Sequence, residues 1–213
     1  MRDEETGSWW QQVTGQAIQG PLKGQKLRSF FHDEMTFALW KQEKPAGRVL
    51  RPDASIERAG EYPPANWEEQ MARVPVTTSA TLDTALESRA LIVGVTISGA
   101  SRAYPFDSVL KQSPILDELG RRPILIVVGD DKKSIRAFGR TVNERKLEFF
   151  VKPNESPFRL VDAETGSEWD FSGKAVSGLL SGTQLTRIPV LNDYWFDWKA
   201  YNPNTTIYRI GDR

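Results

Sequence analysis

The pattern of apolar and polar positions along the chain predicts short strands more often than helices. Ala90–Ile97 and Ile124–Val128 are apolar, β-branched runs that indicate buried strands. Ser98-Gly99 separates the first run from Ala100–Tyr104, a pattern typical of a β-hairpin turn. Ser134–Arg140 predicts a further strand. We therefore expect an α+β fold that is rich in β structure, with mostly antiparallel hairpins and a few short helices.

One stretch of the chain occurs twice and predicts an internal repeat. Residues 162–209 contain Asp-Ala-Glu-Thr-Gly-Ser-Glu-Trp, three spaced glycines and the run Trp-Phe-Asp-Trp-Lys. Residues 3–51 carry matching motifs in the same order, with one extra residue before Gly15. Asp and Gly at these spacings favour hairpin turns, with the Gly at a position of positive φ. Each copy is thus expected to contain hairpins followed by a short helix that carries tryptophan.

The helix of the second copy is the most clearly bounded element of the repeat. Asn192-Asp193 offers an N-cap, and Trp195 and Trp198 follow at helical spacing. The helix should end at Asn202, because the residue before a proline avoids the α region. Thr205–Arg209 is β-branched and predicts a closing strand.

The repeat divides the chain into three expected parts. They are a half module at 1–51, a linker at 52–88 with a short helix from Trp67 to about Arg73, and a complete module at 89–213 whose repeated segment is 162–209. A half module leaves an edge strand unpaired, which is a liability. We expect it to dock onto the complete module or to pair in an oligomer, unless the chain is a truncated piece.

Composition excludes several classes of chemistry. The chain has 213 residues with 28 basic and 28 acidic side chains, so its zero net charge gives no reason to expect nucleic acid as a partner. The absence of Cys excludes disulfides and thiol nucleophiles, and with His32 as the single histidine we expect no metal and no cofactor. The sequence has no run of 18 apolar residues, so we expect no membrane insertion, and no signal peptide is evident.

Acidic pairs and glycines have simple structural interpretations. Asp3 with Glu5, and Asp162 with Glu164, could serve acid–base chemistry or Ca²⁺, but a role in forming turns explains both pairs. Asp130-Asp131 is likewise expected to be a solvated turn. The repeated glycines have the spacing of hairpin turns and do not match a phosphate-binding loop.

The candidate ligand-binding residues are Arg102, Tyr104, Arg140, Trp169 and Trp198. Strand alternation places Arg102 and Tyr104 on one face, where they could bind a carboxylate or phosphate, with Arg140 as a possible third member. A buried ion pair at Arg102 is the favoured alternative. Trp169 and Trp198 could line a ligand groove, although aromatic residues at repeated positions are more typical of a core.

Several of these motifs together resemble a known family. Gly99-Ala-Ser-Arg-Ala-Tyr-Pro105, the Asp162–Trp169 motif and the glycine series from Gly173 are similar to signatures of the bacterial and archaeal family of unknown function numbered 3179. The resemblance implies a periplasmic or extracellular location for a full-length form. Members often carry a Cys-Pro-Leu-Cys segment after the buried strand, where this chain has Gly129–Lys133. They also often carry a His after the helix that follows Arg-Ala-Tyr-Pro, and this chain has Gln112 near that place.

These observations favour a non-catalytic binding or interaction module whose partner is an unknown small molecule or protein. The alternative is a remnant of an exported redox or metal-handling enzyme whose Cys/His site is lost or lies in a missing N-terminal half. A hydrolase that uses carboxylates is a third possibility. Whether the chain is an enzyme stays open at this point, with the balance leaning against catalysis.

Overall fold

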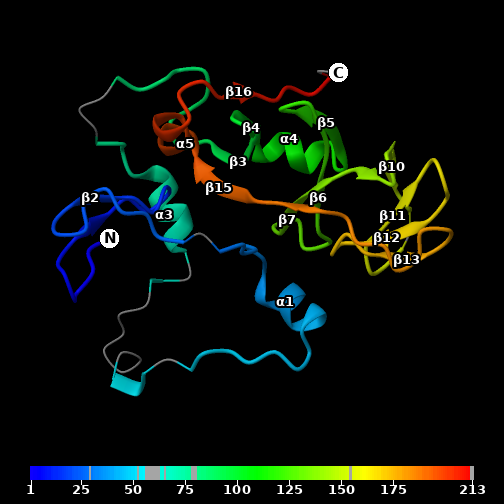
Figure 1. Ribbon diagram of the computed structural model, residues 1–213, viewed down its shortest axis with the longest axis horizontal. Coiled ribbons are helices and arrows are strands. Elements are labelled where there is room, and N and C mark those ends of the chain that lie inside the picture. Colours follow the sequence, from blue (N-terminus) through cyan, green and yellow to red (C-terminus); the bar gives the residue numbers. More distant parts are fainter. Residues whose placement is uncertain are drawn as a thin grey trace. The chain divides into compact units, whose positions relative to one another are not determined.

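The structure is a computed structural model, and it describes residues 1–28, 30–51, 53–55, 63–64, 66–77, 81–153 and 155–211. The chain divides into two compact units, Met1–Asp33 and Glu34–Arg213. Figure 1 labels most of their helices and strands. In the described residues the expected class is confirmed, because antiparallel sheets predominate and the helices are few and short.

The first unit is built on a small hairpin. Strands β1 (Trp9–Trp10) and β2 (Ala17–Gln19) pair antiparallel, with a bulge in β1. Trp10 and Ala17 are buried, whereas Trp9 and Ile18 are exposed. The alternation along these strands therefore sets one covered and one open face.

The first sheet of the second unit has the order β15-β3-β4-β16, formed by Val190–Tyr194, Leu91–Ile97, Ala100–Pro105 and Thr206–Ile207. The predicted turn between β3 and β4 is confirmed, with Ser98 and Gly99 both at positive φ. β16 pairs parallel to β4, which departs from the antiparallel rule of the other pairs.

Helix α5 (Trp195–Tyr201) covers this sheet with two tryptophans. Trp195 and Trp198 are buried with Ile92 and Ala103 in one apolar cluster. A Cβ at Gly94 would lie 2.2 Å from the Trp198 ring, so only a glycine lets the indole pack on β3.

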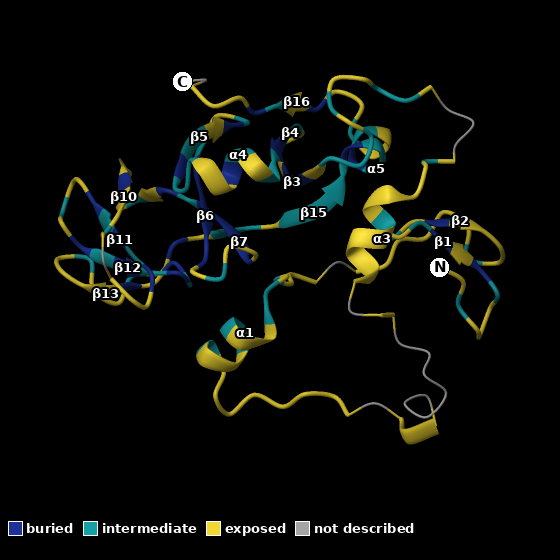
Figure 2. Cartoon of the chain, turned by 180° about the vertical axis from the view of Figure 1, so that it is seen from behind, coloured by how far each residue is buried: buried dark blue, intermediate teal, exposed yellow. Residues whose placement is uncertain are grey.

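The second sheet contains a strand, β6, that is buried on both of its faces. Its order is β14-β7-β6-β5, formed by Arg187–Ile188, Ile135–Gly139, Arg122–Val128 and Ile115–Leu119. Ile124, Ile126 and Val128 of β6 join one apolar cluster, and Leu125 and Val127 join another. This two-sided burial explains the unbroken apolar run, and Figure 2 shows β6 as buried. Helix α4 (Phe106–Lys111) directly follows β4.

The third sheet holds the hairpins predicted from the Asp and Gly spacing. Its order is β10-β11-β12-β13, formed by Phe149–Val151, Arg159–Asp162, Glu168–Asp170 and Ala175–Ser177, all antiparallel. Gly166 and Gly173 have φ values of 67° and 79°, as the turns require. A separate two-stranded ribbon pairs β8 (Thr141–Val142) with β9 (Arg145–Lys146).

One helix has the bounds expected from the sequence, and the start of another is corrected. α1 (Phe37–Glu43) has Thr36 as its N-cap and ends before Pro45, and α3 (Trp67–Arg73) covers the expected span. The predicted Asn192-Asp193 cap of α5 is wrong. Both residues belong to β15 and pair with β3, which keeps the chain extended as far as Tyr194.

No helix in the described residues is long and apolar enough to cross a membrane.

Candidate functional site

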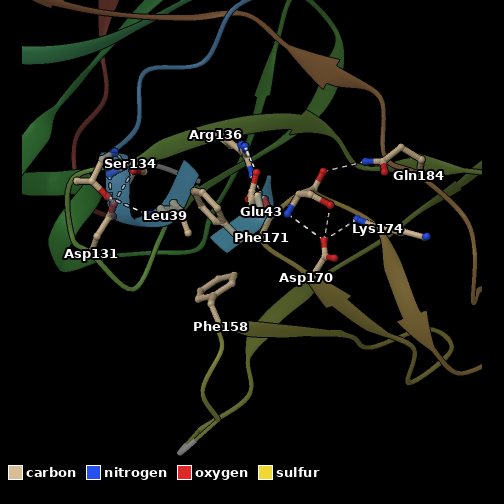
Figure 3. Close-up of polar contacts among 12 residues, drawn as sticks. Leu39, Glu43, Asp131, Ser134, Arg136, Phe158, Asp170, Phe171, Lys174 and Gln184 are labelled. Carbon is tan, nitrogen blue, oxygen red and sulfur yellow. Dashed lines mark hydrogen bonds and ion pairs between the residues drawn. The ribbon is translucent and has the colours of Figure 1, made fainter. Parts of the chain in front are cut away.

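A groove of about 510 Å³ lies between α1 and the sheet β10–β13 in the second unit. Its volume is within the range of small-molecule sites. Figure 3 shows this region, with Leu39 on α1 and Phe171 on the sheet side. The lining residues are Leu39, Gln42, Glu43, Lys44, Asp130, Pro157, Phe158, Arg159, Asp170, Phe171, Ser172 and Lys174.

Two phenylalanines form the apolar floor of the groove. Phe158 directly precedes β11 and Phe171 directly follows β12, so the pairing of these strands brings the rings together. The ring centroids are 5.9 Å apart with an edge-to-face angle of 85°. The Arg136 guanidinium lies over the Phe171 ring at 4.7 Å, and Leu39 packs against the same cluster. The floor is therefore apolar and already well packed.

The start of α1 is attached to the β6–β7 turn by hydrogen bonds. The Thr36 hydroxyl donates to Asp131 Oδ2 at 2.6 Å and its amide donates to Ser134 Oγ at 3.1 Å. Although burial raises it, hydrogen bonds from Ser134 and Thr36 lower the pKa of Asp131 to about 2. Asp131 was expected in a solvated turn. Instead it joins that turn to the helix.

The end of α1 is attached through an ion pair. Glu43 accepts from both terminal nitrogens of Arg136, at 2.5 and 2.8 Å. The Arg136 side chain is only 3% exposed, against 22% for Glu43. Arg136 Nη1 also donates to the Phe171 carbonyl at 3.3 Å. This bidentate geometry fixes the helix beside the floor of the groove.

The other acidic residues of the groove accept hydrogen bonds from the protein itself. Asp170 Oδ1 accepts from the Ser172 amide at 2.9 Å, the Ser172 hydroxyl at 2.6 Å and the Lys174 amide at 3.1 Å. Figure 3 shows this turn, where Gln184 also donates to the Ser172 carbonyl at 2.8 Å. Asp130 Oδ2 accepts from the Phe158 amide at 2.8 Å. Both carboxylates therefore stabilise the loops that line the groove.

The basic residues of the groove are much less engaged. Among the described residues no carboxylate lies in ion-pair distance of Lys44, Arg159 or Lys174. Arg159 donates from Nη1 to the Phe158 carbonyl at 3.0 Å, which leaves its other donors available.

Arg102 and Tyr104 lie at a separate place, on β4, and both contact Asp117 of β5. Arg102 Nη1 and the Tyr104 hydroxyl each lie 2.6 Å from Asp117 Oδ2, and Arg102 Nε donates to Thr206 Oγ1 at 3.0 Å. Burial, and then Asp117, raise the pKa of Tyr104. This geometry is that of a half-buried ion pair, with side chains 25% and 13% exposed. Ligand binding at Arg102 and Tyr104 stays a prediction.

The hydrogen bonds of the Arg140 side chain go to other partners than Arg102 and Tyr104. Arg140 is buried and donates to the carbonyls of Ile124 and Leu147, at 3.1 and 2.8 Å. It therefore satisfies backbone acceptors near the start of β6 and just after β9. A ligand contact for Arg140 stays a prediction.

Trp169 and Trp198 are in two different apolar clusters. The Trp169 indole donates to Asp162 Oδ2 and the Trp198 indole to Thr205 Oγ1, both at 2.9 Å. Their residues are 0% and 3% exposed, and neither lines the groove. A ligand could reach either ring only if the surrounding core opened, so their ligand role stays a prediction.

The groove residues were missed by sequence reasoning, although one signal was present. Arg136 interrupts the apolar strand Ile135–Gly139, and a charge buried in a strand needs a partner. Its partner Glu43 is 93 residues away, on the helix that covers the groove. Among the described residues, no group of three or more His, Cys, Asp or Glu side chains is arranged to hold a metal ion.

The fold and the groove define a small, β-rich α+β protein with a ligand-sized groove between a helix and a hairpin sheet. The chain belongs to the DUF3179 family, described as a protein of unknown function, whose sequence pattern matches residues 1–205. No curated protein and no solved structure matches the chain.

Proposed function

We propose that this chain is a binding module and that the groove between α1 and the sheet β10–β13 holds its ligand. The observation that carries the proposal is the groove itself: a volume of about 510 Å³, an aromatic floor and polar side chains around the rim. Ligand sites typically combine such an apolar surface with a few polar groups that fix orientation.

Binding is favoured over catalysis because the carboxylates of this region already have structural roles. Asp170 and Asp130 accept hydrogen bonds from the loops that line the groove. The pKa of Asp131, beside the start of α1, is about 2. A general acid or base works best with a pKa near the working pH. The groove therefore supports recognition of a ligand better than proton transfer.

The test is a screen of small aromatic and aliphatic fragments by NMR chemical-shift mapping. We expect the shifted amides to gather at Arg159, Ser172 and Lys174. Gln42→Trp should block the groove, because Gln42 is an exposed lining residue of α1. The matched control is Lys41→Trp, an exposed neighbour outside the lining. Shifts that are scattered over the surface, or unchanged in Gln42→Trp, would contradict the proposal.

We also propose that the chain carries a duplicated unit, with a half module at 1–51, a linker at 52–88 and a complete module at 89–213. Equivalent hydrogen bonds at the start of each copy support it. In each copy the Asp carboxylate accepts one hydrogen bond from a Thr amide three residues later and one from a Trp indole seven residues later. In the first copy Asp3 accepts from Thr6 and Trp10. In the second copy Asp162 accepts from Thr165 and Trp169.

A further inference from the structure

We infer that the ligand of the groove is an anion, a carboxylate or phosphate attached to an apolar or aromatic body. The inference rests on the proposed function, since it names the chemistry that the same groove would take. It follows from a difference between the acidic and the basic residues of the lining, which are equal in number but not in their contacts.

The acidic lining residues have partners within the protein. Glu43 faces the Arg136 guanidinium in a two-point ion pair. Asp170 accepts three hydrogen bonds from its own turn, and Asp130 accepts one from a backbone amide. At both Glu43 oxygens, at Asp170 Oδ1 and at Asp130 Oδ2, a cationic ligand would have to displace a donor of the protein.

The basic lining residues surround the groove without carboxylate partners among the residues described. Lys44 follows α1, Arg159 begins β11 and Lys174 lies in the turn before β13. They come from three separate elements, so one anion in the groove can be reached from several sides. Arginine adds a planar pair of donors that suits carboxylate and phosphate oxygens.

The aromatic floor also argues against a cation. An aromatic cage for a cation needs an open ring face. The Arg136 guanidinium already covers a face of Phe171 at 4.7 Å, and Phe158 meets that ring edge to face. Leu39 adds an aliphatic contact beside them (Figure 3). The floor thus offers apolar contact for the body of a ligand, while the rim offers cations for its charge.

The test uses four probes with similar bodies: 3-phenylpropionate, 2-phenylethyl phosphate, 3-phenylpropan-1-ol and 3-phenylpropylamine. Binding is measured on the full chain by NMR shifts of the groove amides. We expect the two anions to bind about tenfold more tightly than the amine, with the alcohol between them. Raising the salt from about 50 mM to about 500 mM should weaken the anions and leave the alcohol unchanged. The carboxylate and phosphate arms show which anion the groove prefers.

Two exposed lysines provide a matched pair of variants. Lys174→Gln should weaken the anions about threefold to tenfold and leave the alcohol unchanged, because it removes only a charge at the rim. Lys146→Gln, on the exposed ribbon outside the lining, should change nothing. If the amine binds in the groove as tightly as the anions, the anion inference is overturned and the binding function stands. If none of the four probes shifts a groove amide, the binding function fails as well.

Discussion

Two hairpins of this protein share their turn chemistry and differ in their surroundings. Trp10 donates to Asp3 at 2.7 Å in the first unit, and Trp169 donates to Asp162 at 2.9 Å in the second. The Thr hydroxyl that follows each Asp bonds both carboxylate oxygens at the same 2.8 and 2.9 Å. Both turns are therefore set by residues inside a span of eight, without help from distant parts of the chain.

The surroundings of the two hairpins are different. β12 pairs with β11 as well as β13, and its sheet covers a large apolar cluster that includes Phe138 and Phe149. In the described residues β1 pairs with β2 and forms one isolated bridge, between Trp9 and Arg2. Leu185 in the second unit is 2% exposed, whereas Leu27, which follows the corresponding glycine series, is 45% exposed. A local motif can thus form the same turn with or without a core around it.

The helices that follow the two hairpins show a similar difference. α5 is held by apolar packing, since Trp195 and Trp198 are both buried. α1 contains no buried residue, and its Phe37 is 61% exposed and stacks on Trp40. Polar contacts at its two ends hold α1 instead, from Thr36 to Asp131 and from Glu43 to Arg136. Figure 2 shows α1 with exposed and intermediate residues only.

The largest effect should come from removing the carboxylate of the buried hairpin. Asp162→Ala leaves the Trp169 indole and the Thr165 amide without their acceptor inside the core, so we expect a loss of about 3 kcal/mol in the free energy of unfolding. Asp3→Ala should cost clearly less, because water can replace the acceptor at a partly exposed turn. Urea denaturation followed by circular dichroism compares the two, and equal losses would contradict this reading of the hairpins.

A smaller effect should separate the two helices. Glu43→Gln removes the charge that compensates the buried Arg136, and because Glu43 is partly exposed we expect a loss of about 2 kcal/mol. Hydrogen exchange should then increase in the amides of α1 and stay unchanged in α5. Lys41→Gln, an exposed change on the same helix, is the control. Faster exchange in both helices would show that α1 is not held separately by its polar ends.

The sequence predicted the parts of the fold that depend on neighbouring residues. The turn at Ser98-Gly99 and the Asp162–Gly166 turn needed only local hydrogen bonds and positive φ. β6 was recognisable because burial on both faces requires a continuous apolar run. Strand β5 was not predicted. The turn between β5 and β6 holds Arg121 at a φ of 62°, a conformation that an arginine in the sequence does not indicate.

The groove could not be predicted, because its parts meet only in the folded chain. Glu43 and Arg136 are 93 residues apart, and the rings of Phe158 and Phe171 face each other only once β11 and β12 have paired. The helix cap at Asn192 failed for a related reason. Pairing with β3 is a long-range contact that overrode a local capping preference.

The smallest predicted effect concerns Asp193, the residue two positions before α5. The residue at the same place before α1 is Met35, which carries no charge. Burial, together with the nearby charges of Asp197 and Glu34, raises the pKa of Asp193 to about 6. The hydrogen bond from the Tyr194 amide lowers this pKa, but its effect is smaller than that of burial. The folded state therefore binds this proton more tightly than the unfolded chain. The Asp193 carboxyl group therefore makes the free energy of unfolding fall as the pH rises from about 4 to about 6. Above about pH 6 this loss of stability is fully present. Asp193→Asn should stabilise the protein by about 1 kcal/mol at pH 7, a value reduced for partial exposure. Urea midpoints at pH 4 and pH 7 measure it: the gain should vanish at the lower pH, and an equal gain at both values would show that the charge of Asp193 is not the cause.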